Sequence, residues 1–111
     1  MIFMVEAVIG KFEDKTVGVG RGEILRYTFR EDGRVYKYYH YVSGECIVEL
    51  YNGSKKVFPD EGGIKAYGIF IVFDFPEPIE FRAGETLIVR YDNVSGGNVR
   101  VISAFTGISS S

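Results

Sequence analysis

Short alternating runs of apolar residues, separated by glycine-rich turns, are the feature that most constrains this chain. The clearest series spans residues 69–105. It opens with Ile-Phe-Ile-Val-Phe at 69–73, which is apolar at both parities, and alternating runs follow at 86–91 and 99–105. Side chains of a strand point alternately to its two faces, so a run that is apolar at both parities predicts a strand covered on both faces. We therefore expect residues 69–73 to be a central strand of an all-β domain.

Three two-residue turn signals predict hairpins in the first half of the chain: Asp32-Gly33, Ser43-Gly44 and Asn52-Gly53. Each lies between runs that read as strands, at 23–30, 34–42, 45–51 and 55–58. Together they predict an antiparallel meander. A helical interpretation is disfavoured, because no window keeps an apolar helical period over three turns and the chain has 14 glycines.

The N-terminal part predicts a strand over residues 2–9, a polar turn at 13–15 and a weak strand at 16–19. Gly18, Gly20 and Gly22 then form a G-x-G-x-G run. A phosphate-binding loop would need a helix directly after it, and no helical period follows. The run instead predicts a bulge or bend where the chain changes sheets.

With 111 residues, the chain predicts a single domain with its own core. About nine strands need two sheets packed face to face, in a sandwich or a flattened barrel. We expect an antiparallel β-sandwich over residues 1–106, followed by a flexible C-terminal tail at 107–111.

Charge and residue counts exclude several classes of function. The formal net charge is −2 with dispersed Lys and Arg, so we expect neither a nucleic-acid partner nor a membrane partner. Apolar runs are too short to span a membrane, so we expect a soluble protein that acts in the cytoplasm of a host cell or inside a particle such as a virion. Cys46 and His40 are the only residues of their kinds, which argues against a disulfide, a zinc site and a Cys-His nucleophile.

We therefore expect no metal, no cofactor and no enzymatic activity. Cys46 adjoins the apolar residues Ile47 and Val48 of a predicted strand and should be a small buried side chain. The best local oxygen set for calcium is Asp92, Asn93 and Asn98, but the same residues are ordinary in turns.

The most conspicuous cluster of side chains is Tyr-Lys-Tyr-Tyr-His-Tyr at residues 36–41. Strict alternation places Tyr36, Tyr38 and His40 on one face of a strand, and Tyr39 and Tyr41 on the other. An aromatic face can stack against sugars or bases, so the first three are candidate ligand-binding residues. Tyr is also favoured at subunit contacts, which makes Tyr39 and Tyr41 candidate interface residues.

One stretch resembles a known group of proteins. The runs Phe-Arg-Ala-Gly-Glu-Thr-Leu-Ile-Val-Arg-Tyr-Asp-Asn at 81–93 and Gly-Asn-Val-Arg-Val at 97–101 are similar to the C-terminal strands of small β-sandwich or jelly-roll modules in virus and phage structural proteins. The resemblance implies a jelly-roll-like, non-enzymatic, self-associating module.

Two functions from different classes remain. The first is a structural or assembly protein that forms homo-oligomers through sandwich faces, because apolar and Tyr residues occupy both parities of several strands. The second is a module that binds a glycan or another ligand through Tyr36, Tyr38 and His40.

Overall fold

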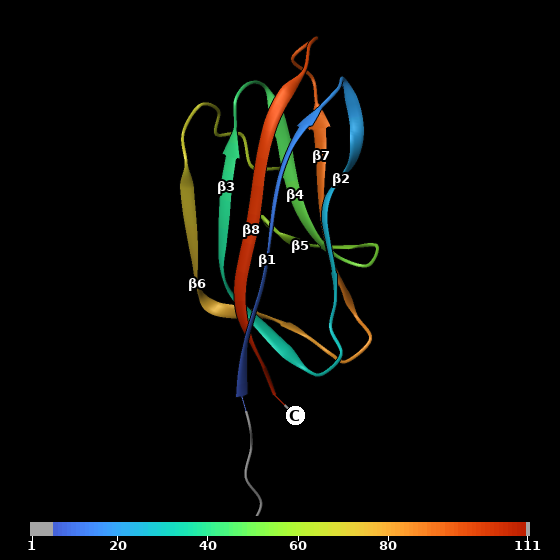
Figure 1. The fold of residues 1–111 in the computed structure, drawn as a ribbon, viewed down its shortest axis with the longest axis vertical. Helices are drawn as coiled ribbons and strands as arrows, with labels where there is room; N and C mark the ends of the chain where they lie inside the picture. Colours follow the sequence, from blue (N-terminus) through green and yellow to red (C-terminus); the bar gives the residue numbers. More distant parts are fainter. Residues whose placement is uncertain (1–5, 111) are drawn as a thin grey trace, which may run out of the picture.

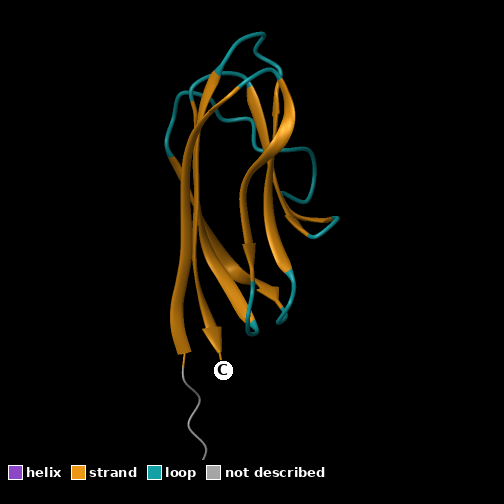
Figure 2. Ribbon diagram, turned by 45° about the vertical axis from the view of Figure 1, so that its right-hand side comes forward, coloured by secondary structure: helices purple, strands orange, loops and turns teal. Residues whose placement is uncertain are grey.

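The computed structural model describes residues 6–110, whose regular elements are all β-strands. There are eight strands, rather than the nine or so expected: β1 (Glu6–Val17), β2 (Gly20–Thr28), β3 (Gly33–Val42), β4 (Cys46–Asn52), β5 (Lys55–Phe58), β6 (Ile71–Phe81), β7 (Thr86–Asn93) and β8 (Val99–Ser110). They form two four-stranded antiparallel sheets, in the orders β1-β8-β3-β6 and β2-β7-β4-β5. The two layers face each other (Figures 1 and 2), which confirms the all-β, two-sheet prediction.

The core fills the space between the sheets with alternate residues of both layers. Phe29 and Phe81 stack with ring centroids 4.5 Å apart, and Phe105 approaches Tyr27 edge-on at 5.1 Å. Full burial of such a side chain contributes roughly 1.5–3 kcal/mol to stability. The inner positions of both sheets are fully or nearly fully buried: Val35, Tyr38, Val42, Val101 and Phe105 in one, Leu25, Cys46, Val48, Leu50, Leu87 and Val89 in the other.

Cys46 is fully buried on the inner side of β4, as predicted. Burial, together with the negative charge of nearby Asp92, raises the pKa of its thiol to about 11. The thiol is therefore protonated at neutral pH and acts as a small apolar side chain.

The polar turn expected at residues 13–15 is wrong. These residues lie inside β1, where Glu13 pairs with Ser103 and Lys15 pairs with Val101. Residues 6–9 and 16–17 of the expected strands thus belong to one strand, while residues 18 and 19 follow its end. Residues 2–5 lie outside the described part. The chain bends after Val17, with Gly20 at a positive φ of 111°, and passes to the other sheet. This confirms the predicted change of sheet at the glycine run.

Of the three predicted hairpins, only Asn52-Gly53 is one: it joins β4 to β5, and Gly53 has a positive φ of 60°. Asp32-Gly33 and Ser43-Gly44 instead carry the chain from one sheet to the other, because β3 lies in a different sheet from β2 and β4. The meander prediction is therefore wrong. A turn signal specifies a reversal of direction, whereas the choice of hydrogen-bonding partner depends on the rest of the chain.

The expected central strand is also wrong. Ile69 and Phe70 precede β6, and β6 is the outermost strand of its sheet. Phe70 is 55% exposed and Val72 is 42% exposed. The outward-facing apolar side chains of this segment are thus not covered by other parts of the domain.

The C-terminal segment differs from the tail expected at 107–111. Gly107 to Ser110 extend β8, with Gly107 paired to Ile9 of β1 and Val35 of β3. Ser111 lies outside the described residues. Both ends of the described chain meet at one end of the sandwich, since Glu6 pairs with Ser110 (Figure 1).

Candidate functional site

The aromatic run of β3 does not form the predicted common face. Tyr38 and His40 point into the core and are fully buried. A β-bulge between Val35 and Lys37 makes Tyr36 an extra residue of the strand. The side chain of Tyr36 therefore points to the face opposite that of Tyr38. Tyr36 lies on the outer side, where the guanidinium of Arg34 is 5.9 Å from its ring centroid. The three residues therefore do not meet, and the buried pair is closed to a ligand.

The contacts of the buried pair are structural. The hydroxyl of Tyr38 shares a hydrogen bond of 2.7 Å with Oγ of Ser103, and burial raises the pKa of Tyr38. Nε2 of His40 lies 3.1 Å from the carbonyl oxygen of Ala66 and must carry the proton, since a carbonyl only accepts. Its Nδ1 is buried and has no hydrogen-bond partner among the described residues. Burial consequently lowers the pKa of His40.

The other parity of β3 contributes to an apolar row that crosses a whole sheet. The strand register places Phe12 of β1 beside Ala104 of β8, Ala104 beside Tyr39 of β3, and Tyr39 beside Val72 of β6. These positions alternate with the core positions, so they lie on the outer face. In the next row Ile102 pairs with Tyr41. The ring of Phe70 lies 6.4 Å from that of Tyr39.

We call these seven residues the aromatic band: Phe12, Tyr39, Tyr41, Phe70, Val72, Ile102 and Ala104. Phe12, at 63% exposed, is its most open member, and Phe70 and Val72 are also exposed. Tyr39 and Tyr41 are half-buried among their neighbours on the face. The structure thus places both predicted interface residues within the band. Contact with another subunit there stays a prediction.

Ion pairs flank the aromatic band on both sides along the strands. Arg100 donates two hydrogen bonds to the carboxylate of Asp14, at 3.0 and 2.6 Å. These bonds hold the pKa of Asp14 below its usual value. On the other side Lys37 pairs with Asp74 at 3.3 Å, and Arg34 pairs with Glu6 at 3.3 Å. Each of these charges on the face therefore has an opposite charge beside it.

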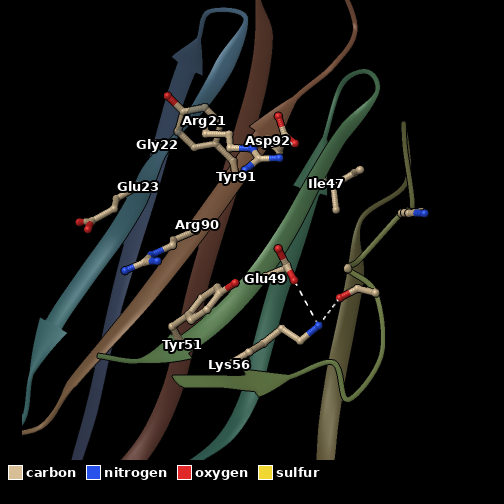
Figure 3. A pocket seen from close by; sticks show the side chains of 13 residues that line it. Arg21, Gly22, Glu23, Ile47, Glu49, Tyr51, Lys56, Arg90, Tyr91 and Asp92 are labelled. Atoms are coloured by element: carbon tan, nitrogen blue, oxygen red, sulfur yellow. Dashed lines mark hydrogen bonds and ion pairs between the residues drawn. The ribbon is translucent and has the colours of Figure 1, made fainter. Parts of the chain in front are cut away.

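The second sheet carries a polar hollow on its outer face. The hollow has a volume of about 590 Å³, lies over β2, β7 and β4, and is bordered by Gly62, Gly63 and Lys65 of the β5–β6 loop (Figure 3). A Cβ at Gly63 would overlap the side chain of Ile47, so glycine lets this loop lie directly against β4. The lining holds four cationic and three carboxylate side chains: Arg21, Lys56, Lys65 and Arg90, with Glu23, Glu49 and Asp92.

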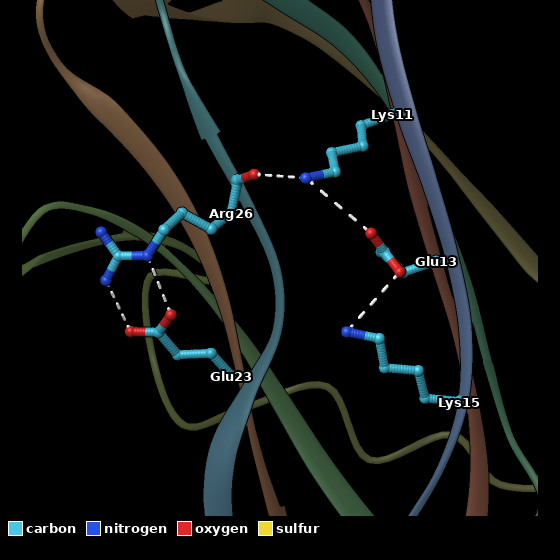
Figure 4. A network of polar contacts seen from close by, with 5 residues as sticks. All are labelled: Lys11, Glu13, Lys15, Glu23 and Arg26. Atoms are coloured by element: carbon cyan, nitrogen blue, oxygen red, sulfur yellow. Dashed lines mark hydrogen bonds and ion pairs between the residues drawn. The ribbon is translucent and has the colours of Figure 1, made fainter.

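Charged residues occupy the inner side of the edge strand β1. Nζ of Lys11 donates a hydrogen bond of 2.9 Å to the carbonyl oxygen of Arg26 in β2 (Figure 4). The carboxylate of Glu13 forms ion pairs with Lys11 and Lys15, at 3.8 and 3.6 Å. Inward-pointing charges, Lys above all, disfavour the addition of another strand to an open edge.

The opposite edge of the same sheet, β6, is interrupted differently. It contains Pro76 and Pro78, which have no N–H to donate to a neighbouring strand. Both edges of the β1-β8-β3-β6 sheet are thus poorly suited to strand pairing, while its outer face remains open.

Sequence reasoning missed Phe12, Phe70, Val72, Ile102 and Ala104 as surface residues. A signal for Phe12 was present, because Lys11, Glu13 and Lys15 alternate with it and predict a strand rather than a turn. For Phe70 and Val72 the sequence carries no such signal. An apolar outward parity looks the same whether it is covered within the domain or faces outward.

Asn93 and its neighbours form a hydrogen-bonded loop rather than a set of free oxygen ligands. Oδ1 of Asn93 accepts hydrogen bonds from N and Oγ of Ser95 at 3.0 and 2.8 Å, while Nδ2 donates to the carbonyl oxygens of Val17 and Gly97. The side chain of Asn93 therefore stabilises the β7–β8 loop, which is a common role of asparagine in turns.

Comparison of the sequence with models of protein families and with curated proteins finds no match. Among residues 6–110, no helix has the length and apolar character needed to cross a bilayer. The function is therefore argued from the geometry of the molecule.

Proposed function

We propose that this protein is a non-enzymatic structural protein that self-associates through the aromatic band, as a component of an assembled particle such as a virion. The observation that carries the proposal is the apolar row Phe12, Ala104, Tyr39 and Val72, which continues across all four strands of one sheet. Contiguous exposed apolar surface of this kind is typical of protein–protein contacts.

The order of the strands supports a jelly roll as the finer fold. Successive strands alternate between the two sheets, except that β4 and β5 share one. In each sheet the strands that are neighbours in space are, with that exception, distant in sequence. An eight-stranded double sheet of this kind is common in viral capsid and lectin domains. Because one fold serves many functions, the apolar outer face favours assembly more specifically than the topology does.

The charges of the face favour a second copy as the partner. A symmetric contact brings a surface against itself, so an excess of either charge would repel. Here the pairs Asp14–Arg100, Lys37–Asp74 and Glu6–Arg34 are each neutral. The band between them can approach its own copy without bringing unpaired like charges together.

The size of the face is also adequate. Four strands of 10 to 12 residues, about 4.8 Å apart and with a rise of about 3.3 Å per residue, give on the order of 700 Å² per copy. Stable interfaces bury about 800 Å² per partner. Contact between two complete faces would therefore be of the standard size.

Sizing with light scattering tests the proposal. We expect the wild type to have a mass that is a multiple of 12.5 kDa, and Phe12→Glu to shift it to the monomer, because a buried carboxylate in an apolar contact is strongly unfavourable. Val19→Glu is the matched control: Val19 is 65% exposed, close to the 63% of Phe12, but lies in the bend outside the band. A wild type that is monomeric at tens of micromolar, or equal masses for the two variants, would overturn the proposal.

A further inference from the structure

The three carboxylates that line the hollow of the second sheet already have cationic partners. Asp92 pairs with Arg21 at 3.2 Å and Glu49 pairs with Lys56 at 3.2 Å. Glu23 accepts two hydrogen bonds from Arg26, at 3.0 and 2.8 Å, and these lower its pKa. Little of the carboxylate charge is left to neutralise the remaining cations.

Two cations of the lining, Arg90 and Lys65, form no ion pair with any described residue. Arg90 belongs to β7, which lies between β2 and β4 in the sheet. It is paired in the strand register with Glu23 of β2 and with Glu49 of β4. Its guanidinium is 4.5 Å from the ring centroid of Tyr51, and Figure 3 shows the two side chains next to each other in the hollow. A guanidinium placed against a ring is held in position while its N–H groups can still bind an anion.

The surroundings of Arg90 restrict what that anion can belong to. The hollow holds one cation more than it has carboxylates, so its surplus matches a single negative group. A highly charged polyanion such as nucleic acid needs a larger positive surplus than this hollow has. Glu49 and Asp92 still present carboxylate oxygens to the hollow. These carboxylates can accept hydrogen bonds from hydroxyl groups. Ile47 and Tyr51 supply apolar contact for a ring.

From this arrangement we propose that the hollow binds an acidic saccharide, with Arg90 and Lys65 holding the carboxylate of the sugar and Glu49 accepting from its hydroxyls. The volume of about 590 Å³ lies within the range of small-molecule sites, roughly 300–1,000 Å³, and suits a short oligosaccharide. The site lies on the sheet opposite the aromatic band, so it remains open when two copies meet face to face.

The test is an NMR titration of the wild type with galacturonate, which carries one carboxylate, and with galactose as the neutral counterpart that lacks it. We expect millimolar galacturonate to shift amides in β4, β7 and residues 62–65, and galactose to leave them unchanged. Arg90→Gln should weaken binding by roughly 10- to 100-fold, since hydrogen bonds to charged groups contribute about 1.5–3 kcal/mol. Lys37→Gln removes one positive charge from the other sheet and should bind as the wild type does.

Lys65→Gln provides a second variant that leaves the sheet unchanged, and it should also weaken binding if Arg90→Gln does not fold. Three results would overturn the proposal: no shifts with galacturonate, equal shifts with galactose, or equal losses in the Lys65 and Lys37 variants. Equal shifts with inorganic phosphate would also overturn it, because the hollow would then bind anions in general rather than a saccharide.

Discussion

The outer faces of the two sheets differ in how their charges are arranged. On β1-β8-β3-β6 the flanking charges pair with one another and leave an apolar band between them. On β2-β7-β4-β5 many outward positions are charged, and the β5–β6 loop borders a hollow in which Arg90 and Lys65 remain unpaired among the described residues. The two faces belong to one sandwich and share one core.

The contrast shows that the alternation of apolar and polar residues along a strand predicts which side chains face the core, but not what the outer side chains contact. Most inner positions of both sheets, apart from those of the edge strand β1, are apolar because they meet in the core. Outer positions are free to follow function, so one sheet suits a protein contact and the other a small polar ligand. Three changes test this contrast, in addition to the variants of Phe12 and Arg90.

The largest effect is expected at the edge that separates the two faces. Lys11→Val together with Lys15→Val removes the inward lysines of β1 and leaves a more apolar open edge, with Glu13 as the inward charge that remains. We expect most of the protein to form β-rich aggregates, measured by thioflavin T fluorescence and light scattering. Lys11→Arg with Lys15→Arg keeps the charges and should remain dispersed. If the valine variant has the same mass distribution as the wild type, edge protection by these lysines is refuted.

An intermediate effect is expected from acid, through His40. This residue lies inside the first sheet and holds Ala66 of the loop that borders the hollow, so it connects the two halves of the comparison. Its pKa in the folded state is lowered from the ordinary 6.5, and the unfolded chain therefore takes up the proton first as the pH falls. The contribution to stability is complete above about pH 6.5 and declines below it, by at most about 1.4 kcal/mol per pH unit.

Urea denaturation at a series of pH values measures this dependence. His40→Gln keeps an N–H donor for Ala66 but cannot titrate, so its stability should fall less steeply between about pH 6.5 and 5. The carboxylates titrate in both proteins and cancel in the difference. Parallel curves for the two proteins would show that His40 does not govern the acid response.

The smallest effect is the opposite response of the two faces to salt. Raising the ionic strength shortens the Debye length from about 30 Å at 0.01 M to about 3 Å at 1 M. Saccharide binding at Arg90 should therefore weaken several-fold, whereas association through the aromatic band should stay constant or strengthen. Titrations and sizing at the two salt concentrations measure both. A parallel loss of both activities would mean that the face also depends on its charges.

Several features follow from local sequence alone. Alternating runs without a helical period establish the all-β class, and this holds because the period of two is a property of each strand by itself. Asn52-Gly53 makes a hairpin and Gly20 makes a bend because both need backbone angles that glycine adopts readily. The burial of Cys46 follows from its apolar neighbours.

The candidate sites depend on contacts between distant residues. Tyr36 leaves the side of Tyr38 because of a bulge that forms against β6 and β8. The aromatic band joins four strands, from Phe12 to Ala104, and the hollow needs residues 62–65 to lie over β4. No local pattern encodes these pairings, so the site residues predicted from the strand alone, Tyr36, Tyr38 and His40, are not brought together.

The amino-acid sequence by itself determined that this protein is made of strands, where several of them turn, and that apolar residues exceed the needs of one side. Only the tertiary structure decided which strands are neighbours, that residues 71–81 lie at an edge, and which apolar side chains face outward. The physical reason is that side-chain alternation and turn geometry act over a few residues. Register and sheet order, in contrast, minimise the free energy of the whole chain at once.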